Sequence, residues 1–465
     1  MTVDLVIANS HVVLPDGIVE KNILIDNEKI IGFSNEIPQC NQKIDGTGLI
    51  SIPGAIDTHV HYGVYSPINQ AAKTESHAAA IGGITTMMRM LRLNDSFSNS
   101  LKPQLEASSK NHYVDYAIHS SIFNKTQINE MPYCLENGIN SFKIYMNLGG
   151  EIGHVYMDMP PDSNSLIEAN VNVTNQIVED TVKTAAKLGC PVLVHAEDYE
   201  SCGCGIKTAK EKNQDGLGAW SKSRSPEFEV KAIKTVSKFG RDHNCVIYFV
   251  HIGSELALQQ IQEERKLGTK IFVETCPHYL TLSHEEQAGY LAKVMPPIRT
   301  NKDRDSVWKS LSNNLIDTIG TDHVANQLQL KLGGKDVWGA LAGFPGIGTV
   351  LPILLNDGVN QDKISLEQFT KFTSENAAKI FGMYPTKGCL SPGSDADITM
   401  IDLKLEKKVS NELFGGFSDY IVYEGRTLKG WPVKTIVRGH LVAENFSVVG
   451  KLGHGKLVKR KIENL

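Results

Sequence analysis

Residues 176–195 read QIVEDTVKTAAKLGCPVLVH and contain the repeating unit that decides the fold. Four apolar residues recur at helical spacing in the first part of this stretch, which predicts an amphipathic helix. They are Val178, Val182, Ala185 and Leu188. Gly189 is expected to end the helix, and the apolar run 191–194 that follows is typical of a strand buried on both faces. That strand ends on His195.

The same unit recurs along the chain. A helical pattern is expected to stop near Gly240, and a strand over 246–250 then ends on His251. Further strands are predicted at 55–61, 139–146 and 315–319. Alternating helices and strands imply a parallel sheet, and about eight such units fit between residues 53 and 385. The sequence therefore predicts an α/β fold, a (β/α)8 TIM-type barrel over 53–385.

The two ends of the chain have a different residue pattern, which is typical of β-strands. Residues 1–52 contain short alternating strands separated by turn residues such as Pro15-Asp16-Gly17. A comparable pattern returns in residues 386–465, for example at 397–401 and 433–439. We expect the two segments to share one small β-sandwich domain, with 1–52 as its N-terminal part.

The composition is that of a globular protein with a sizeable core. Hydrophobic residues make up 41% of the chain and charged residues 21%, and the formal net charge of −5 comes without a dense basic stretch. We therefore expect no nucleic-acid partner. The uncharged stretch over residues 339–355 is shorter than the ~20 apolar residues of a membrane span, so no membrane partner is expected either.

The N-terminus and the cysteines favour a cytoplasmic location. The first residues lack both the basic start and the long apolar run of a secretory signal. Eight cysteines spread from Cys40 to Cys389 fit reduced thiols better than a disulfide framework. Cys202 and Cys204 form the one close pair, and this pair is a weak indication of a metal site.

His59 and His61 are the first candidate metal ligands. Residues two apart on a strand face the same side, so both imidazoles can bind one ion, although an isolated pair of this kind is more often structural. His195, His251 and Asp322 each follow a predicted buried strand, where the active sites of barrels lie. Four histidines and a carboxylate at one barrel mouth predict a site for zinc, manganese or iron.

Lys143 lies inside the apolar strand predicted over 139–146. On its own such a lysine is best explained as a snorkelling or ion-paired side chain. Among metal ligands, however, a neutral lysine amine can take up carbon dioxide and become a carbamate whose two oxygens bridge two cations. Burial and nearby cations both favour the neutral amine that this reaction needs.

Seven segments of the chain resemble those of the cyclic amidohydrolases, the group of hydantoinases, dihydropyrimidinases, allantoinases and dihydroorotases. They are Asp57–His61 (DTHVH), Ser141–Lys143 (SFK), Val194–Glu197 (VHAE), Val250–Ile252 (VHI), Glu274–Leu280 (ETCPHYL), Pro296–Arg299 (PPIR) and Gly320–His323 (GTDH). The resemblance covers nearly the whole chain. It implies a hydrolase of carbon–nitrogen bonds in cyclic amides, imides or ureides.

The resemblance also implies a dinuclear site and its roles. His59 and His61 would bind the more buried ion, His195 and His251 the more exposed one, and carbamylated Lys143 would bridge them; the metals would be two divalent ions, zinc first. Asp322 would bind the buried ion and act as general base, while a hydroxide shared by the metals attacks the ring carbonyl. A homotetramer is expected by the same analogy. His278, His323 and Glu197 are interpreted as groups that support the ligands.

The substrate is less well determined, because this chain departs from its relatives near the expected pocket. Dihydroorotases usually have an arginine where this chain has Gly63, which weighs against dihydroorotate as the substrate. Hydantoinases and dihydropyrimidinases usually have a tyrosine at the position of Leu148 and a serine at that of Met295. An allantoinase or dihydroorotase-type hydrolase therefore stands as an alternative to a hydantoinase-like enzyme. We expect four residues to contact substrate, namely Leu148, Tyr156, Met295 and Gly343.

Residues 147–172 form a long insertion directly after the strand that carries Lys143, so we predict a lid over the barrel mouth. Tyr156 is our candidate to replace the missing tyrosine. Two other functions compete with ring hydrolysis. A non-catalytic scaffold is disfavoured because all six ligand positions are intact, and a mononuclear deaminase or similar hydrolase would not need Lys143.

Overall fold

A closed ring of parallel strands forms the centre of the computed structural model, which describes residues 2–286 and 289–462. The strands of the ring are β6 (Ala55–His61), β7 (Ile84–Leu91), β8 (Asp115–Ser121), β9 (Phe142–Tyr145), β12 (Val192–His195), β13 (Ile247–Phe249), β14 (Ile271–Thr275), β15 (Thr318–Ile319) and β16 (His323–Val324). The short strands β15 and β16 belong to one segment broken at residues 320–322. Because β15 pairs with β14 and β16 pairs with β6, this segment closes the ring. The predicted TIM-type barrel is confirmed.

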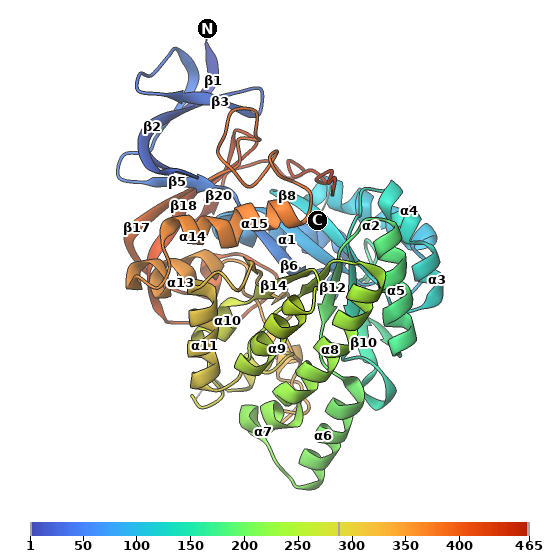
Figure 1. The fold of residues 1–465 in the computed structure, drawn as a ribbon. Coiled ribbons are helices and arrows are strands. Elements are labelled where there is room, and N and C mark those ends of the chain that lie inside the picture. The colour runs from blue at the N-terminus through green and yellow to red at the C-terminus, as the bar shows by residue number, and fades with distance from the viewer. Residues whose placement is uncertain (1, 287–288, 463–465) are drawn as a thin grey trace.

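Helices surround the barrel, as Figure 1 shows. They are α1 (Ile68–Ile81), α2 (Phe97–Asn111), α3 (Lys125–Asn129), α4 (Met131–Glu136), α5 (Asn175–Lys187), α6 (Tyr199–Glu211), α7 (Gly216–Ser223), α8 (Pro226–His243), α9 (Glu255–Lys266), α10 (Pro277–Thr281), α11 (Asn301–Ser312), α12 (Leu328–Lys331), α13 (Val350–Asp357), α14 (Leu366–Thr370) and α15 (Asn376–Ile380). No helix of the described chain is both long and apolar enough to cross a bilayer.

The predicted unit around residues 176–195 is present as α5 and β12. The side chain of Thr174 accepts a hydrogen bond from the backbone N–H of Ile177 and caps the start of α5. Gly189 follows the helix with φ of 66°, a left-handed conformation that glycine adopts without steric cost. The chain then turns directly into the buried strand that ends on His195.

The expected end of the next helix near Gly240 is wrong. Helix α8 continues to His243, and Asn244 with φ of 52° ends it instead. A Cβ on Gly240 would lie 2.7 Å from Cγ1 of Ile247, so this glycine allows the helix to pack closely on β13. Two predicted strands are also shorter than expected, since β9 covers 142–145 and β15 only 318–319.

The two chain ends form one sheet beside the barrel (Figure 1). Its strands are β1 (Val3–Leu14), β2 (Gly17–Asp26), β3 (Lys29–Ser34), β4 (Cys40–Asp45), β5 (Ile50–Pro53), β17 (Ile398–Lys408), β18 (Thr427–Val437), β19 (His440–Glu444) and β20 (Ser447–Val448). β5 pairs antiparallel with β17, which joins the N-terminal strands to the C-terminal ones. Ile30 on β3 and Ile436 on β18 come from strands five apart in the sheet order but share one buried cluster, so the sheet curves around a common core. The predicted β unit shared by both ends is confirmed.

Buried ion pairs join the barrel to this sheet. Lys387 donates to Asp115, the first residue of β8, at 2.7 Å and to Asp397 at 2.5 Å. Arg438, next to β18, also pairs with Asp115. Burial alone would raise the pKa of Asp115, but Lys387 and Arg438 outweigh burial and hold that pKa below its usual value of 3.8.

Candidate active site

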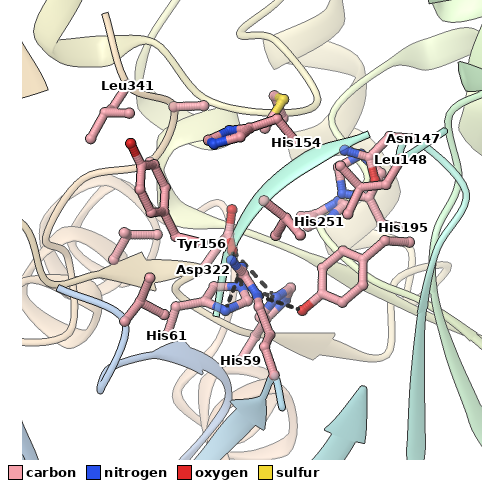
Figure 2. Close-up of a pocket in the computed structure, with 18 of the residues that line it drawn as sticks. His59, His61, Asn147, Leu148, His154, Tyr156, His195, His251, Asp322 and Leu341 are labelled. Carbon is pink, nitrogen blue, oxygen red and sulfur yellow. Dashed lines mark hydrogen bonds and ion pairs between the residues drawn. The ribbon is translucent and has the colours of Figure 1, made fainter. Parts of the chain in front are cut away.

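The candidate ligands lie at the C-terminal ends of the barrel strands. His59 and His61 belong to β6, and His195 is the last residue of β12. His251 follows β13, and Asp322 lies in the break between β15 and β16. Figure 2 shows these five side chains facing one cavity.

Three of these side chains meet at one point. Nε2 of His59 lies 3.2 Å from Nε2 of His61, and Oδ1 of Asp322 lies 3.3 Å and 3.1 Å from these two nitrogens. The three residues can therefore offer ligand atoms to one ion. The ring of His251 is stacked 5.3 Å from that of His59, and the ring of His195 lies 4.5 Å from that of His251.

The backbone at two of these positions is left-handed. His251 has φ of 45° and Asp322 has φ of 49°. Non-glycine residues seldom adopt such values, and those that do are concentrated at functional sites. Both residues lie outside the barrel strands, each shortly after one, and both line the cavity.

Carboxylates fix the orientation of two histidines. Oε1 of Glu274, on β14, lies 2.8 Å from Nδ1 of His59, which leaves the Nε2 lone pair of His59 for the site. Oε2 of Glu197 lies 2.6 Å from Nε2 of His195 and also accepts a hydrogen bond from Arg224 at 2.6 Å. The other ring nitrogen of His195, Nδ1, is therefore the one available to a ligand.

Lys143 projects from β9 into the barrel and is completely buried. Its Nζ has no hydrogen-bond partner among the described residues, and neither does Nδ1 of His251. Burial lowers the pKa of Lys143 to about 7, so its amine is readily neutral. Buried polar atoms without partners are rare, and here they adjoin a set of nitrogen and oxygen ligands; the residues thus fit a centre of divalent cations.

The cavity above the ligands has a volume of about 180 Å³. All four residues expected to contact substrate line it, namely Leu148, Tyr156, Met295 and Gly343. Val64 and Leu341 add further apolar lining to a cavity that also contains the histidines and Asp322. The space suits a small ring that has both polar and apolar parts.

The insertion 147–172 lies over this cavity. It contains an antiparallel hairpin of β10 (His154–Met157) and β11 (Ile167–Asn170), and Tyr156 stands at the rim of the cavity in Figure 2. The ring of Tyr156 lies 5.5 Å from that of Tyr65. The end of the hairpin is anchored to the barrel, because the backbone N–H of Met159 donates to the carbonyl of Gly63 at 2.6 Å.

His278 and His323 do not line the cavity. Nε2 of His323 lies 2.8 Å from Oε2 of Glu75, and its Nδ1 accepts a hydrogen bond from the backbone N–H of Gly346 at 3.0 Å. His278 is buried beside the rings of Tyr279 and Phe344. None of these contacts reaches a candidate ligand, so the supporting role expected for the two histidines stays a prediction.

The cysteines form no disulfide, since all eight are free. Cys202 and Cys204 both lie on α6, where Cys202 is buried and Cys204 is exposed. Residues two apart on a helix do not face each other, so this pair cannot readily share an ion.

Two residues of the site were not assigned a role from the sequence. Glu274 orients His59, but the sequence identified it only as the first residue of the ETCPHYL motif. Arg92 follows the last residue of β7 and lines the cavity, with Nη2 2.8 Å from Nδ1 of His61. Its position directly after an apolar strand is the signal that could have identified it, since the same position singled out His251.

Comparison with known proteins identifies relatives over nearly the whole chain. The model of the amidohydrolase family matches residues 166–442. The L-hydantoinase of Paenarthrobacter aurescens is 30% identical over an alignment of 470 positions that covers 98% of each chain. The D-hydantoinase of Ralstonia pickettii is also 30% identical, covering 98% of this chain and 99% of the relative.

Solved structures agree with these matches. An L-hydantoinase (dihydropyrimidinase) from Arthrobacter aurescens superposes with a TM-score of 0.90 at 28% identity, covering 98% of this chain and 100% of the other. The dihydropyrimidinase from Brevibacillus agri NCHU1002 gives a TM-score of 0.88 at 29% identity, with 99% of both chains covered.

Proposed function

Because the chain belongs to the cyclic amidohydrolases of the amidohydrolase family, metal-dependent hydrolases of ring carbon–nitrogen bonds, we propose that it opens a hydantoin-type or dihydropyrimidine-type ring. The observation that carries the proposal is the meeting of His59, His61 and Asp322 at the floor of a small cavity. Full-length similarity to hydantoinases supports the ring type.

We assign two divalent cations to the six predicted ligands. His59, His61 and Asp322 would hold one ion, and His195 and His251 the other. A carbamate on Lys143 would bridge the two ions, which accounts for the unpartnered buried amine. When bound, the ions supply an activated water and polarise the ring carbonyl.

The protein groups then have distinct tasks. Hydrolysis adds the hydroxyl of water to the carbonyl carbon and a proton to the ring nitrogen, and the bond between these two atoms breaks. Asp322 takes the proton of the attacking water and passes it to that nitrogen, which is a poor leaving group unless protonated. The apolar wall that contains Leu148 and Met295 holds the ring and limits water around it.

Four finer features are part of the same proposal. Zinc is the proposed metal, with manganese or iron as alternatives suited to the same ligands. The assembly is proposed to be a homotetramer, and the location the cytoplasm, where eight free cysteines are compatible with a reducing environment. The substrate is a small cyclic amide or ureide.

A turnover screen with metal analysis tests the proposal. The purified chain, supplied with zinc or manganese and bicarbonate, is assayed against hydantoin, dihydrouracil, allantoin, dihydroorotate and simple cyclic imides. We expect two ions per chain and opening of hydantoin or dihydrouracil. Two ions per chain without turnover of either ring would refute the proposed ring type.

The matched variants are Lys143→Met and His440→Asn. Lys143→Met removes the carbamate-forming amine and is expected to lower metal content below two ions and to reduce kcat at least about 1000-fold, since the activated water is lost. His440 is exposed on β19, so His440→Asn is expected to leave both quantities unchanged. Two firmly bound ions in Lys143→Met would contradict the bridging role.

A further inference from the structure

One cation faces the cavity from outside the set of ligands. Arg92 is the one arginine or lysine among the described residues that line it. Its Nη2 lies 2.8 Å from Nδ1 of His61, and its Nε donates to the hydroxyl of Tyr145 at 3.2 Å. The guanidinium carbon is 5.1 Å from the centre of the Tyr145 ring. These contacts hold the guanidinium in the wall beside His61.

The charge of Arg92 has no carboxylate partner within 4.0 Å in the described parts of the chain. Asp158 accepts a hydrogen bond from the backbone N–H of Arg92, at 3.0 Å, but none from its guanidinium. The charge of Asp158 is matched by Arg89, whose Nη2 lies 2.9 Å from Oδ2 of Asp158. A half-buried guanidinium without a counter-ion, open to a cavity, attracts an anion from outside the protein.

Metal binding would remove the acceptor that Arg92 now uses. A neutral histidine that binds an ion through Nε2 carries its proton on Nδ1. Nε2 of His61 is the atom that faces His59 and Asp322, so Nδ1 of His61 then cannot accept a hydrogen bond from Arg92. Nη2 of Arg92 is left to find another acceptor. Asp322 is the only carboxylate that lines the cavity in the described chain, and it is itself a proposed ligand.

We propose that Arg92 binds a carboxylate on a short side arm of the substrate ring, so that the substrate class is an anionic cyclic amide or ureide. Guanidinium and carboxylate pair through two parallel hydrogen bonds, which gives both affinity and orientation. The inference rests on the proposed function and names the substrate class of that site. It places the recognition of charge directly after β7, at Arg92, whereas Gly63, shortly after β6, occupies the position where dihydroorotases usually have an arginine.

Two rings of nearly equal shape test this role. Hydantoin-5-acetate and its neutral carboxamide are compared in wild type, Arg92→Gln and Arg92→Lys. Wild type is expected to prefer the carboxylate, and Arg92→Gln to lower its kcat/KM about 10- to 100-fold, as for loss of a hydrogen bond to a charged group. Turnover of the carboxamide should change less than about 3-fold, and Arg92→Lys should restore part of the loss.

Binding without turnover gives an independent readout. Calorimetric titration of the metal-loaded full chain with the ring-opened product of hydantoin-5-acetate, which keeps the carboxylate arm, is expected to show binding that Arg92→Gln loses. Arg304 pairs with Glu286 on the outside of the barrel, so Arg304→Gln is the matched control and should behave as wild type.

The outcomes separate the two proposals. If wild type opens neither ring, the proposed function fails, while binding of the carboxylate that depends on Arg92 still supports this inference. If Arg92→Gln slows both rings equally or loses its metal, Arg92 serves the ligands and the inference is overturned. The inference is also overturned if wild type opens both rings equally well or prefers the carboxamide.

Discussion

Gly63 illustrates how a single position shapes the wall of the cavity. It has φ of 92°, and a Cβ there would lie 2.4 Å from Nη2 of Arg89. Arg89 cannot move away easily, because this nitrogen is held by Gln104 at 3.0 Å and by Asp158 at 2.9 Å. The absence of a side chain at Gly63 therefore leaves room for the buried ion pair between Arg89 and Asp158, which joins the insertion 147–172 to β7.

Gly63→Ala is expected to destabilise the protein by about 1–3 kcal/mol, through backbone strain and displacement of Arg89. The urea midpoint of unfolding measures this loss. Gly32→Ala is the control, since a Cβ on Gly32 meets nothing within 4 Å. Equal midpoints for the two variants would contradict the packing argument.

Individual ligands were predictable from sequence where strand ends were clear. His195 and His251 follow uninterrupted apolar strands, which identified them without any structure. Arg92 was missed because residues 86–93 contain two arginines, and alternation alone does not tell which of them reaches the cavity. The structure separates them: Arg89 lies in β7 and pairs with Asp158, whereas Arg92 follows the strand and reaches the cavity wall.

At the scale of elements, the hairpin of β10 and β11 is the part of the insertion that brings Tyr156 to the cavity. Tyr156 reaches the cavity from β10, and Leu148 stands where relatives usually have a tyrosine. The existence of the lid followed from the length of the insertion. Its hairpin did not, because the sequence of 154–170 has too little alternation to indicate two paired strands.

Tyr156→Phe is expected to lower kcat/KM about 5- to 10-fold if the hydroxyl contacts the ring, since a neutral hydrogen bond contributes about 1 kcal/mol. Tyr156→Ala should reduce it further by opening the apolar wall. Steady-state kinetics on the true substrate measures both effects. Tyr384 is exposed and distant from the cavity, so Tyr384→Phe is the control. Unchanged turnover in Tyr156→Phe would show that Tyr156 does not replace the missing tyrosine.

Element boundaries were less predictable than element types. β6 was predicted to the residue, from Ala55 after Pro53-Gly54 to His61. α8 ran past its expected end, since Gly240 serves close packing rather than termination. A glycine that allows close packing, such as Gly240, cannot be told apart in the sequence from one that ends a helix, such as Gly189.

At the scale of the whole molecule, the buried cluster of Asp115, Lys387 and Arg438 makes the stability of the barrel and the end sheet depend on pH. The folded-state pKa of Asp115 lies below 3.8, so the unfolded chain binds more protons under acidic conditions. The stabilising contribution is therefore complete above 3.8 and is lost as the pH falls through the folded-state pKa.

We expect the urea midpoint of the wild type to fall as the pH drops below about 4, and that of Asp115→Asn to be lower at pH 5 but less dependent on pH. Asp305 is exposed on α11, so Asp305→Asn should follow the wild-type curve. A pH dependence in Asp115→Asn equal to that of wild type would show that other carboxyls cause the acid sensitivity.

The pairing of β5 with β17 also has a consequence for synthesis on the ribosome. About 345 residues separate Pro53 from its partner Ile398. At 5–20 residues per second, the N-terminal strands wait roughly 20–70 s before that partner exists. During this interval the edge of β5 is open to pairing with other nascent chains. A chaperone that shields this edge, or a slow stretch of codons placed after it, would change the yield of active protein without altering any residue of the mature enzyme.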